Sequence, residues 1–165
     1  MIIQAVASLL AAVAQAATPA PVPCSDEAYS DFDFWVGVWD VYSGDQLAGR
    51  NVITKEESGC LVLETWTSAR GSTGQSYNYY DPAKDKWRQV WVSAGIFIDY
   101  EGGLDDQGRM VLEGTITSNT DGKVAPFRGQ WAPLDDGTVQ QTFWTYDAEA
   151  DSWNIWFDGN YRRAE

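Results

Sequence analysis

Short runs of aromatic and β-branched residues alternate with turn signals along almost the whole chain. Each run is about 7–11 residues long and has the Trp, Tyr, Phe, Val, Ile and Thr content that is typical of β-strands. The turns carry Gly, which adopts positive φ, and Asp, which hydrogen-bonds to its own backbone. They fall at residues 43–45, 58–59, 71–74, 81–85, 94–95, 103–108, 121–122, 135–137 and 147–151.

This spacing predicts an all-β fold with about ten strands joined by short hairpin links. Strands joined in this way pair antiparallel, and about ten of them close into an up-and-down barrel that leaves no edge strand exposed. After the first 16 residues, a short turn at 26–30 is the one segment with a helical pattern.

Residues 32–42, Phe-Asp-Phe-Trp-Val-Gly-Val-Trp-Asp-Val-Tyr, predict the first strand of this barrel. Gly37 has no side chain and Trp39 carries a bulky indole, so the two form a Gly-x-Trp unit. In a closed barrel such a unit lets the strand bend while the indole plugs one end. The sequence therefore points to a container.

Strand alternation decides which residues share the interior face, because successive side chains point to opposite faces. One alternating set mixes aromatic, amide and hydroxyl groups with a carboxylate, and this mixture is typical of an amphipathic pocket. We expect it to line the lumen, and it comprises Val62, Glu64, Trp66, Ser76, Asn78, Tyr80, Trp87, Gln89, Trp91, Leu112, Gly114, Arg128, Gln130, Gln141, Phe143, Ile155 and Phe157. The opposite set is the alternative interior, and it contains Leu61, Leu63, Thr65, Val90 and Val92.

Within the favoured set, two tryptophans and four polar residues are the candidate ligand-binding residues. Trp66 and Trp91 are expected to form walls, since indole rings prefer sheltered positions. The candidate hydrogen-bonding partners are Glu64, Asn78, Gln89 and Gln141. For the tryptophans as a group, core packing is the competing explanation.

Glu64 lies between Leu63 and Thr65, in a strand with few other charges. In a lumen it would anchor a ligand hydroxyl or amine, or act as a carboxylate with a raised pKa. The structural alternative is an ion pair with Arg88 or Arg128, or simple exposure to water.

The formal net charge is −13, with 24 acidic and 11 basic residues. Phosphate backbones and anionic membranes require clustered cations, so neither nucleic acid nor a membrane surface is an expected partner. Histidine is absent, which excludes Ser-His triads, His-ligated haem and the usual zinc sites. Asp99, Glu101, Asp105 and Asp106 do not match the calcium-loop spacing. We expect no metal and no cofactor.

The first 16 residues are small or apolar and carry no charge, and they end in Ala14-Gln15-Ala16. This pattern predicts a secretory signal peptide at 1–16, although it lacks the usual basic start, and a misread start or a buried helix is the alternative. A Pro-rich linker and N-terminal segment follows at 17–31, and a single barrel domain covers 32–165. The protein is thus expected to be exported, to the periplasm or the extracellular space.

Cys24 and Cys60 are the chain's two cysteines. In an exported protein such a pair predicts a disulfide, which would pin the N-terminal segment to the barrel wall. Two unpaired buried thiols are the alternative.

Several ordered motifs resemble domain-of-unknown-function family 1579, a group of small bacterial proteins. The motifs lie at residues 32–41, 59–66, 78–82, 87–92 and 157–161, and together they span nearly all of the chain after the linker. The resemblance implies a lipocalin-like, calycin-type barrel, but no activity and no catalytic residues. Nitrobindin-like barrels also open with Gly-x-Trp, yet they hold haem through a histidine that this chain lacks.

The favoured function is an exported barrel that binds a small apolar or amphipathic molecule in its lumen. The alternative is a carboxylate-dependent enzyme, a hydrolase or isomerase, with Glu64 as its acid/base. A membrane-embedded barrel is disfavoured, because charged residues such as Lys55, Glu113 and Arg128 interrupt the strands. No pattern in the sequence indicates whether the protein is a monomer or an oligomer.

Overall fold

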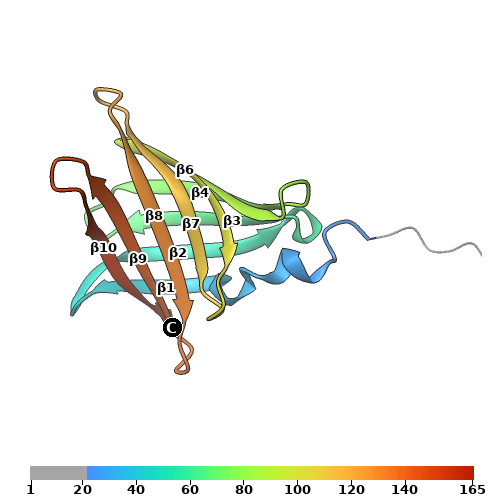
Figure 1. The fold of residues 1–165 in the computed structure, drawn as a ribbon. Coiled ribbons are helices and arrows are strands. Elements are labelled where there is room, and N and C mark those ends of the chain that lie inside the picture. Colours follow the sequence, from blue (N-terminus) through green and yellow to red (C-terminus); the bar gives the residue numbers. More distant parts are fainter. Residues whose placement is uncertain (1–21) are drawn as a thin grey trace, which may run out of the picture.

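The computed structural model describes residues 22–165, so the predicted signal peptide at 1–16 and the start of the linker, 17–21, lie outside the described residues. Within 22–165, ten strands form one sheet (Figure 1). The strands are β1 (Gly37–Ser43), β2 (Gln46–Glu56), β3 (Leu61–Ser68), β4 (Thr73–Asp81), β5 (Lys86–Ser93), β6 (Ile96–Leu104), β7 (Met110–Ser118), β8 (Val124–Pro133), β9 (Val139–Asp147) and β10 (Ser152–Arg163). The 3-10 helices are η1 (Glu27–Ser30), η2 (Asp33–Trp35) and η3 (Glu57–Gly59).

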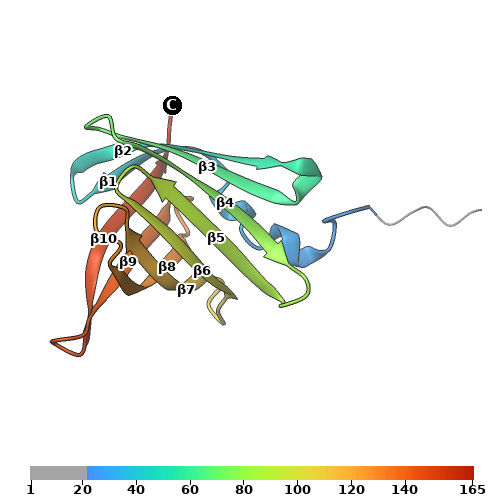
Figure 2. The ribbon, with the colours of Figure 1, turned by 90° about the horizontal axis from the view of Figure 1, so that it is seen from above.

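Each strand pairs antiparallel with the next, and β1 also pairs with β10, so the sheet closes into a barrel (Figures 1 and 2). Trp39 in β1 lies opposite Arg163 in β10, and Val41 lies opposite Tyr161. The prediction of an all-β, antiparallel up-and-down barrel of about ten strands is confirmed. The turn chemistry explains this success, because every link between strands in the described residues is short and carries the Gly, Asp or Ser that a tight reversal needs.

The first strand is shorter than the sequence predicts. Residues 32–36 precede it, η2 occupies Asp33–Trp35, and β1 begins only at Gly37. Their aromatic content favours a strand, but strand propensity is easily overridden by packing. Phe32 and Trp35 are fully buried where the chain crosses the end of the barrel. The helical turn of η2 allows both side chains to point into the barrel.

The N-terminal segment, residues 22–36, closes this end of the lumen, which we call the closed end (Figure 1). The ring of Phe32 contacts those of Trp35 and Trp131 at centroid distances of 4.9 and 5.2 Å. The indole Nε1 of Trp87 donates a hydrogen bond of 3.0 Å to the carbonyl of Ala28 in η1. Aromatic side chains from the segment and from the barrel therefore fill this end together.

Two further contacts hold the segment in place. The predicted disulfide between Cys24 and Cys60 is confirmed, and it ties the segment to the link between β2 and β3. The Lys55 ammonium lies 2.6 Å from a carboxylate oxygen of Asp33, and it also donates to the carbonyl of Tyr29. The disulfide thus fixes the segment to the β2–β3 link, and Lys55 fixes it to β2.

The Gly-x-Trp unit lies at the closed end. Trp39 is fully buried, and the guanidinium of Arg163 stacks 3.8 Å from the centre of its ring. A Cβ at Gly37 would overlap that guanidinium, and the φ of +149° also excludes most other residues there. Gly37 therefore leaves room for the cation that covers Trp39.

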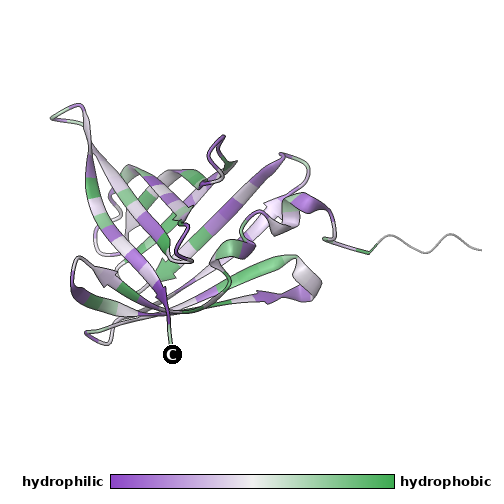
Figure 3. Ribbon diagram, turned by 90° about the horizontal axis from the view of Figure 1, so that it is seen from below, coloured by the Kyte–Doolittle hydropathy of each residue, from purple (hydrophilic) through white to green (hydrophobic). Residues whose placement is uncertain are grey.

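Hydrophobic and hydrophilic residues alternate along several strands (Figure 3), and successive side chains point to opposite faces of the sheet. Val62, Glu64 and Gln89, all in the set expected inside, are buried. The expectation was wrong for β8, where Phe127 and Trp131 point inward and Arg128 pairs with Glu113 outside.

Two more residues of the expected interior set lie elsewhere. Gln130 has the same parity as Arg128 and so shares its outer face. Ile155 is 65% exposed, because a register shift between Ile155 and Phe157 reverses the alternation in the first half of β10.

Candidate functional site

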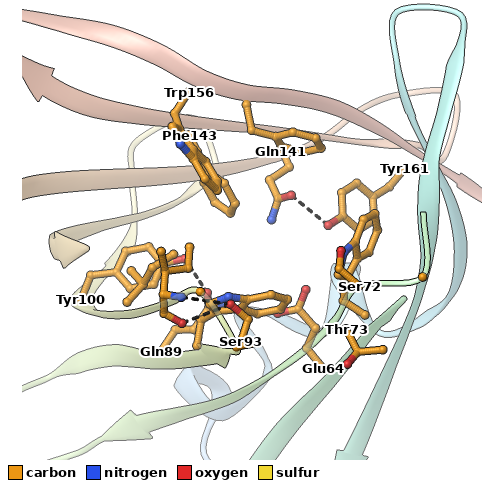
Figure 4. Close-up of a pocket in the computed structure, with 18 residues that line it drawn as sticks. Glu64, Ser72, Thr73, Gln89, Ser93, Tyr100, Gln141, Phe143, Trp156 and Tyr161 are labelled. Atoms are coloured by element: carbon orange, nitrogen blue, oxygen red, sulfur yellow. Dashed lines mark hydrogen bonds between the residues drawn. The ribbon is translucent and has the colours of Figure 1, made fainter. Parts of the chain in front are cut away.

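A cavity of about 470 Å³ occupies the half of the lumen opposite the closed end. Residues of the β3–β4 and β5–β6 links form its rim, and we call this the open end (Figure 4). Its apolar lining is mostly aromatic and comprises Trp66, Trp91, Ile96, Ile98, Tyr100, Phe143, Trp156, Phe157 and Tyr161. Its polar lining comprises Glu64, Ser72, Thr73, Gln89, Ser93 and Gln141.

Glycines position the two tryptophan walls. A Cβ at Gly74 in β4 would overlap the indole of Trp91, and a Cβ at Gly49 in β2 would overlap that of Trp66. Each ring therefore lies over a neighbouring strand that has no side chain at that point. This arrangement keeps both indoles along the wall and leaves the centre of the lumen open.

The opposite wall is built from β9 and β10. The ring of Phe143 contacts Trp156 at 6.2 Å and Phe157 at 6.1 Å between centroids. Behind Phe143, Phe127 connects this wall to the core at a centroid distance of 5.3 Å. Trp156 is 51% exposed, so this wall reaches from the core to the solvent.

The floor of the cavity is a chain of buried polar side chains whose donors all point toward Glu64. Tyr100 donates its hydroxyl to Gln89, and Gln89 donates its amide to Asn78. Asn78 Nδ2 then donates to Ser76 Oγ at 2.9 Å. Ser76 donates its hydroxyl to Glu64 Oε2 at 2.5 Å. The chain connects four neighbouring strands, β3 to β6.

A second arm reaches Glu64 from the other side. Asn51 Nδ2 donates to Glu64 Oε1 at 2.6 Å and to the Tyr161 hydroxyl at 3.1 Å. The Tyr161 hydroxyl in turn donates to Gln141 Oε1 at 2.8 Å (Figure 4). The side-chain carbonyl of Gln141 thus accepts a hydrogen bond within the network, and its amide N–H groups point toward the cavity (Figure 4).

Burial raises the pKa of Glu64 from 4.5 to about 7, and the hydrogen bonds from Asn51 and Ser76 oppose that rise. Burial also raises the pKa of Tyr100 and Tyr161 well above 10, and the Glu64 charge adds to this effect. Both phenols are therefore neutral hydrogen-bonding groups near neutral pH. Glu64 is the group in the cavity lining that changes charge there.

The predicted site residues come together with one exception. Glu64, Trp66, Gln89, Trp91 and Gln141 all line the cavity. Asn78 is fully buried behind them, between Ser76 and the carbonyl of Val62.

The prediction that Glu64 pairs with an arginine is wrong, as is the idea that it faces water, since its exposed fraction is 4%. Arg88 forms a two-pronged ion pair with Asp99 on the outer surface, and Arg128 pairs with Glu113. Among residues 22–165, no group of three His, Cys, Asp or Glu side chains is placed to hold a metal.

Sequence reasoning missed several contributors to the site, among them Asn51, Tyr100, Trp156 and Tyr161. Strand alternation carries a signal for two of them, because Tyr100 follows the buried Ile98 by two residues and Asn51 precedes the buried Ile53 by two. No such signal marks Trp156 as a residue of the lumen, because the bulge beside it interrupts the alternation.

A comparison of the sequence with models of protein families finds no match, and no curated protein matches it significantly. The site must therefore be interpreted from its own geometry. In residues 22–165, no helix has the length and apolar character needed to span a membrane.

Proposed function

We propose that the barrel binds one small apolar or amphipathic molecule in the open half of its lumen. The observation that carries this proposal is the cavity of about 470 Å³ with aromatic walls and a polar floor. Pockets for small ligands typically have volumes of about 300–1,000 Å³, apolar walls and a few convergent polar groups. Here the walls would bury the apolar body, and the floor would receive a polar group.

The polar floor is built in advance of any ligand. Glu64 and Gln141 are each held by side chains from other strands, and both are at least 96% buried. A ligand therefore meets groups whose side-chain freedom is already lost, which reduces the entropic cost of binding.

A neutral fluorescent probe, N-phenyl-1-naphthylamine, tests this proposal. We expect saturable binding to the purified protein, and a loss of about tenfold or more in affinity on Trp91→Ala, because a stacked aromatic wall disappears. Trp153→Ala is the matched control, since this indole lies on the outer hairpin against Tyr146. Equal affinity in both variants would contradict the proposed site, and circular dichroism would show whether each barrel is folded.

The cellular location and the family belong to the same proposal. The leader pattern at 1–16 and the Cys24–Cys60 disulfide both support export to the periplasm or the extracellular space. The closed ten-stranded barrel supports the lipocalin-like, family-1579 resemblance. Cell fractionation of the tagged full-length chain tests export, and retention in the cytoplasm with Met1 intact would contradict it.

One observation favours a second candidate, a hydrolase or isomerase with Glu64 as its acid/base. A carboxyl group with a pKa near 7 in a sheltered cavity suits proton transfer at neutral pH. The test has two steps. The small molecule that co-purifies with the protein from its native source is extracted, and it is then incubated with an excess of the protein while its mass and chirality are followed. A ligand that stays unchanged contradicts catalysis.

A further inference from the structure

The lining of the cavity contains one ionisable carboxyl group and no cationic side chain. Glu64 lies at its floor, and neither Lys nor Arg is among the lining residues. The other ionisable lining groups are Tyr100 and Tyr161, which stay protonated near neutral pH. When Glu64 ionises, no positive charge in the cavity compensates for it.

Hydrogen bonding leaves this carboxylate partly unsatisfied. Asn51 and Ser76 each donate one hydrogen bond to it, whereas an ionised carboxylate offers about four acceptor positions. The carboxylate points into the cavity, where a ligand group can reach it (Figure 4). An N–H donor that also carries positive charge is the strongest partner for such a group.

Aromatic rings surround the space above the carboxylate. Trp66 and Trp91 line one side of the cavity, and Phe143 and Trp156 line the other. The faces of such rings attract cations, most strongly in a site that excludes water. The formal charge of −13 also raises the local concentration of cations around the molecule.

We propose that the ligand is an amphipathic organic amine, whose ammonium group binds Glu64 at the floor and whose apolar body lies between the aromatic walls. This inference rests on the proposed function, because it names the chemical class that the same cavity binds. Anionic amphiphiles such as fatty acids are disfavoured, since their carboxylate would meet Glu64 with no cation between them.

The pH dependence of binding follows from the same contact. The groups that face Glu64 are Asn51 from β2, Ser76 from β4, Tyr100 from β6 and Tyr161 from β10, and Glu64 is the member that ionises near neutral pH. An ammonium binds the ionised form, so amine affinity rises with pH and levels off above about 7. Well below that value, it falls about tenfold per pH unit.

The experiment compares octylamine, 1-octanol and octanoate, which share one chain and differ in the head group. Each is titrated at pH 8 against protein loaded with N-phenyl-1-naphthylamine, and displacement gives its affinity. We expect octylammonium to bind at least tenfold more tightly than octanol, and octanoate to bind more weakly than either. Repeating the titration at pH 6 should weaken the amine and leave the alcohol unchanged.

Two variants with the same change in net charge complete the test. Glu64→Gln should weaken octylamine roughly 30-fold or more, the effect of removing one partner from a buried charge pair, and leave octanol within about threefold. Glu149→Gln removes a carboxylate from the exposed β9–β10 link at the same end of the barrel and should preserve the preference.

The outcomes separate the two proposals. If octanol binds as tightly as octylamine, or if the amine preference survives in Glu64→Gln, the amine inference is overturned and the ligand-binding function stands. If neither the fluorescent probe nor any octyl compound binds, both proposals fail. Octanol binding in Glu64→Gln shows that the variant retains its cavity.

Discussion

The two ends of the lumen contain similar side chains but use them differently. At the closed end, Phe32, Trp35 and Trp131 contact one another with ring centroids 4.9–5.6 Å apart, and all three are fully buried. At the open end, Trp66 and Trp91 lie against glycines and line a cavity. Aromatic content alone therefore does not distinguish a plug from a pocket.

The difference comes from what enters each end. The N-terminal segment, residues 22–36, inserts Phe32 and Trp35 into one half of the lumen, whereas no described residue fills the other half. The polar network around Glu64 lies between the two halves. We therefore expect substitutions at the closed end to act mainly on stability, and substitutions at the open end to act mainly on binding.

The largest expected effect is that of Trp35→Ala. Removing a fully buried indole from the closed end should lower the free energy of unfolding by about 3–5 kcal/mol, as measured by urea denaturation. Trp156→Ala at the open end is the matched comparison, and because its side chain is 51% exposed, its cost should stay below about 1.5 kcal/mol. Equal losses would remove the distinction between the two ends.

The disulfide tests whether the plug needs its covalent tie. Cys24 and Cys60 are separated by 36 positions in the sequence, and a cross-link of this span contributes about 4 kcal/mol through the unfolded state. The double variant Cys24→Ser, Cys60→Ser should lose about that much in urea denaturation. Unchanged stability would mean that the aromatic contacts alone hold the segment.

The third expected effect concerns Glu64 and pH. Because the folded-state pKa is about 7 against a usual 4.5, the unfolded chain releases this proton at lower pH. Its contribution to stability is therefore complete below about pH 4.5 and is lost as the pH rises through about 7, a loss of about 3 kcal/mol.

Urea denaturation at pH 5 and pH 8 measures this loss in the wild type and in Glu64→Gln. The difference between the two proteins isolates Glu64, because the other carboxylates contribute to both. We expect the wild type to lose about 2–3 kcal/mol more than the variant. Parallel pH profiles would contradict the buried, high-pKa carboxyl group.

The last expected effect is that of Gly74→Ala, which should be smaller than those of Trp35→Ala, the disulfide and Glu64. The new methyl group overlaps the Trp91 indole, so the ring must move into the cavity, at a cost of about 1–2 kcal/mol. Probe affinity should fall severalfold as the cavity shrinks. Gly103→Ala is the control, because a Cβ there meets no atom within 4 Å. Unaltered affinity in Gly74→Ala would show that Trp91 does not shape the site.

Sequence patterns predicted the features that depend on local chemistry. Turn residues located the strand boundaries, and alternation placed Glu64, Gln89 and Gln141 on one face. The conformation of residues 32–35 was not predicted correctly, because it depends on contacts with rings such as that of Trp131, which is distant in the sequence. Ile155 escaped prediction because a bulge shifts the register within β10.

The direct partners of Glu64 come from the two neighbouring strands, but the extension of the network from Asn51 to Tyr161 and Gln141 depends on closure of the barrel. Asn51 and Tyr161 are 110 residues apart in the sequence, yet one hydrogen bond joins them. Antiparallel alternation predicts which residues face inward but not which of them meet across the lumen. The polar network, and with it the high pKa of Glu64, became visible only in three dimensions.

The most direct test of the account uses the indole N–H signals of the tryptophans in a two-dimensional ¹H–¹⁵N NMR spectrum, assigned by Trp→Phe variants. N-phenyl-1-naphthylamine is added to saturation. The account predicts that the signals of Trp66, Trp91 and Trp156 shift, while those of Trp35 and Trp131 keep their positions. Shifts confined to the closed end, or no shifts at all, would contradict a binding site in the open half of the lumen.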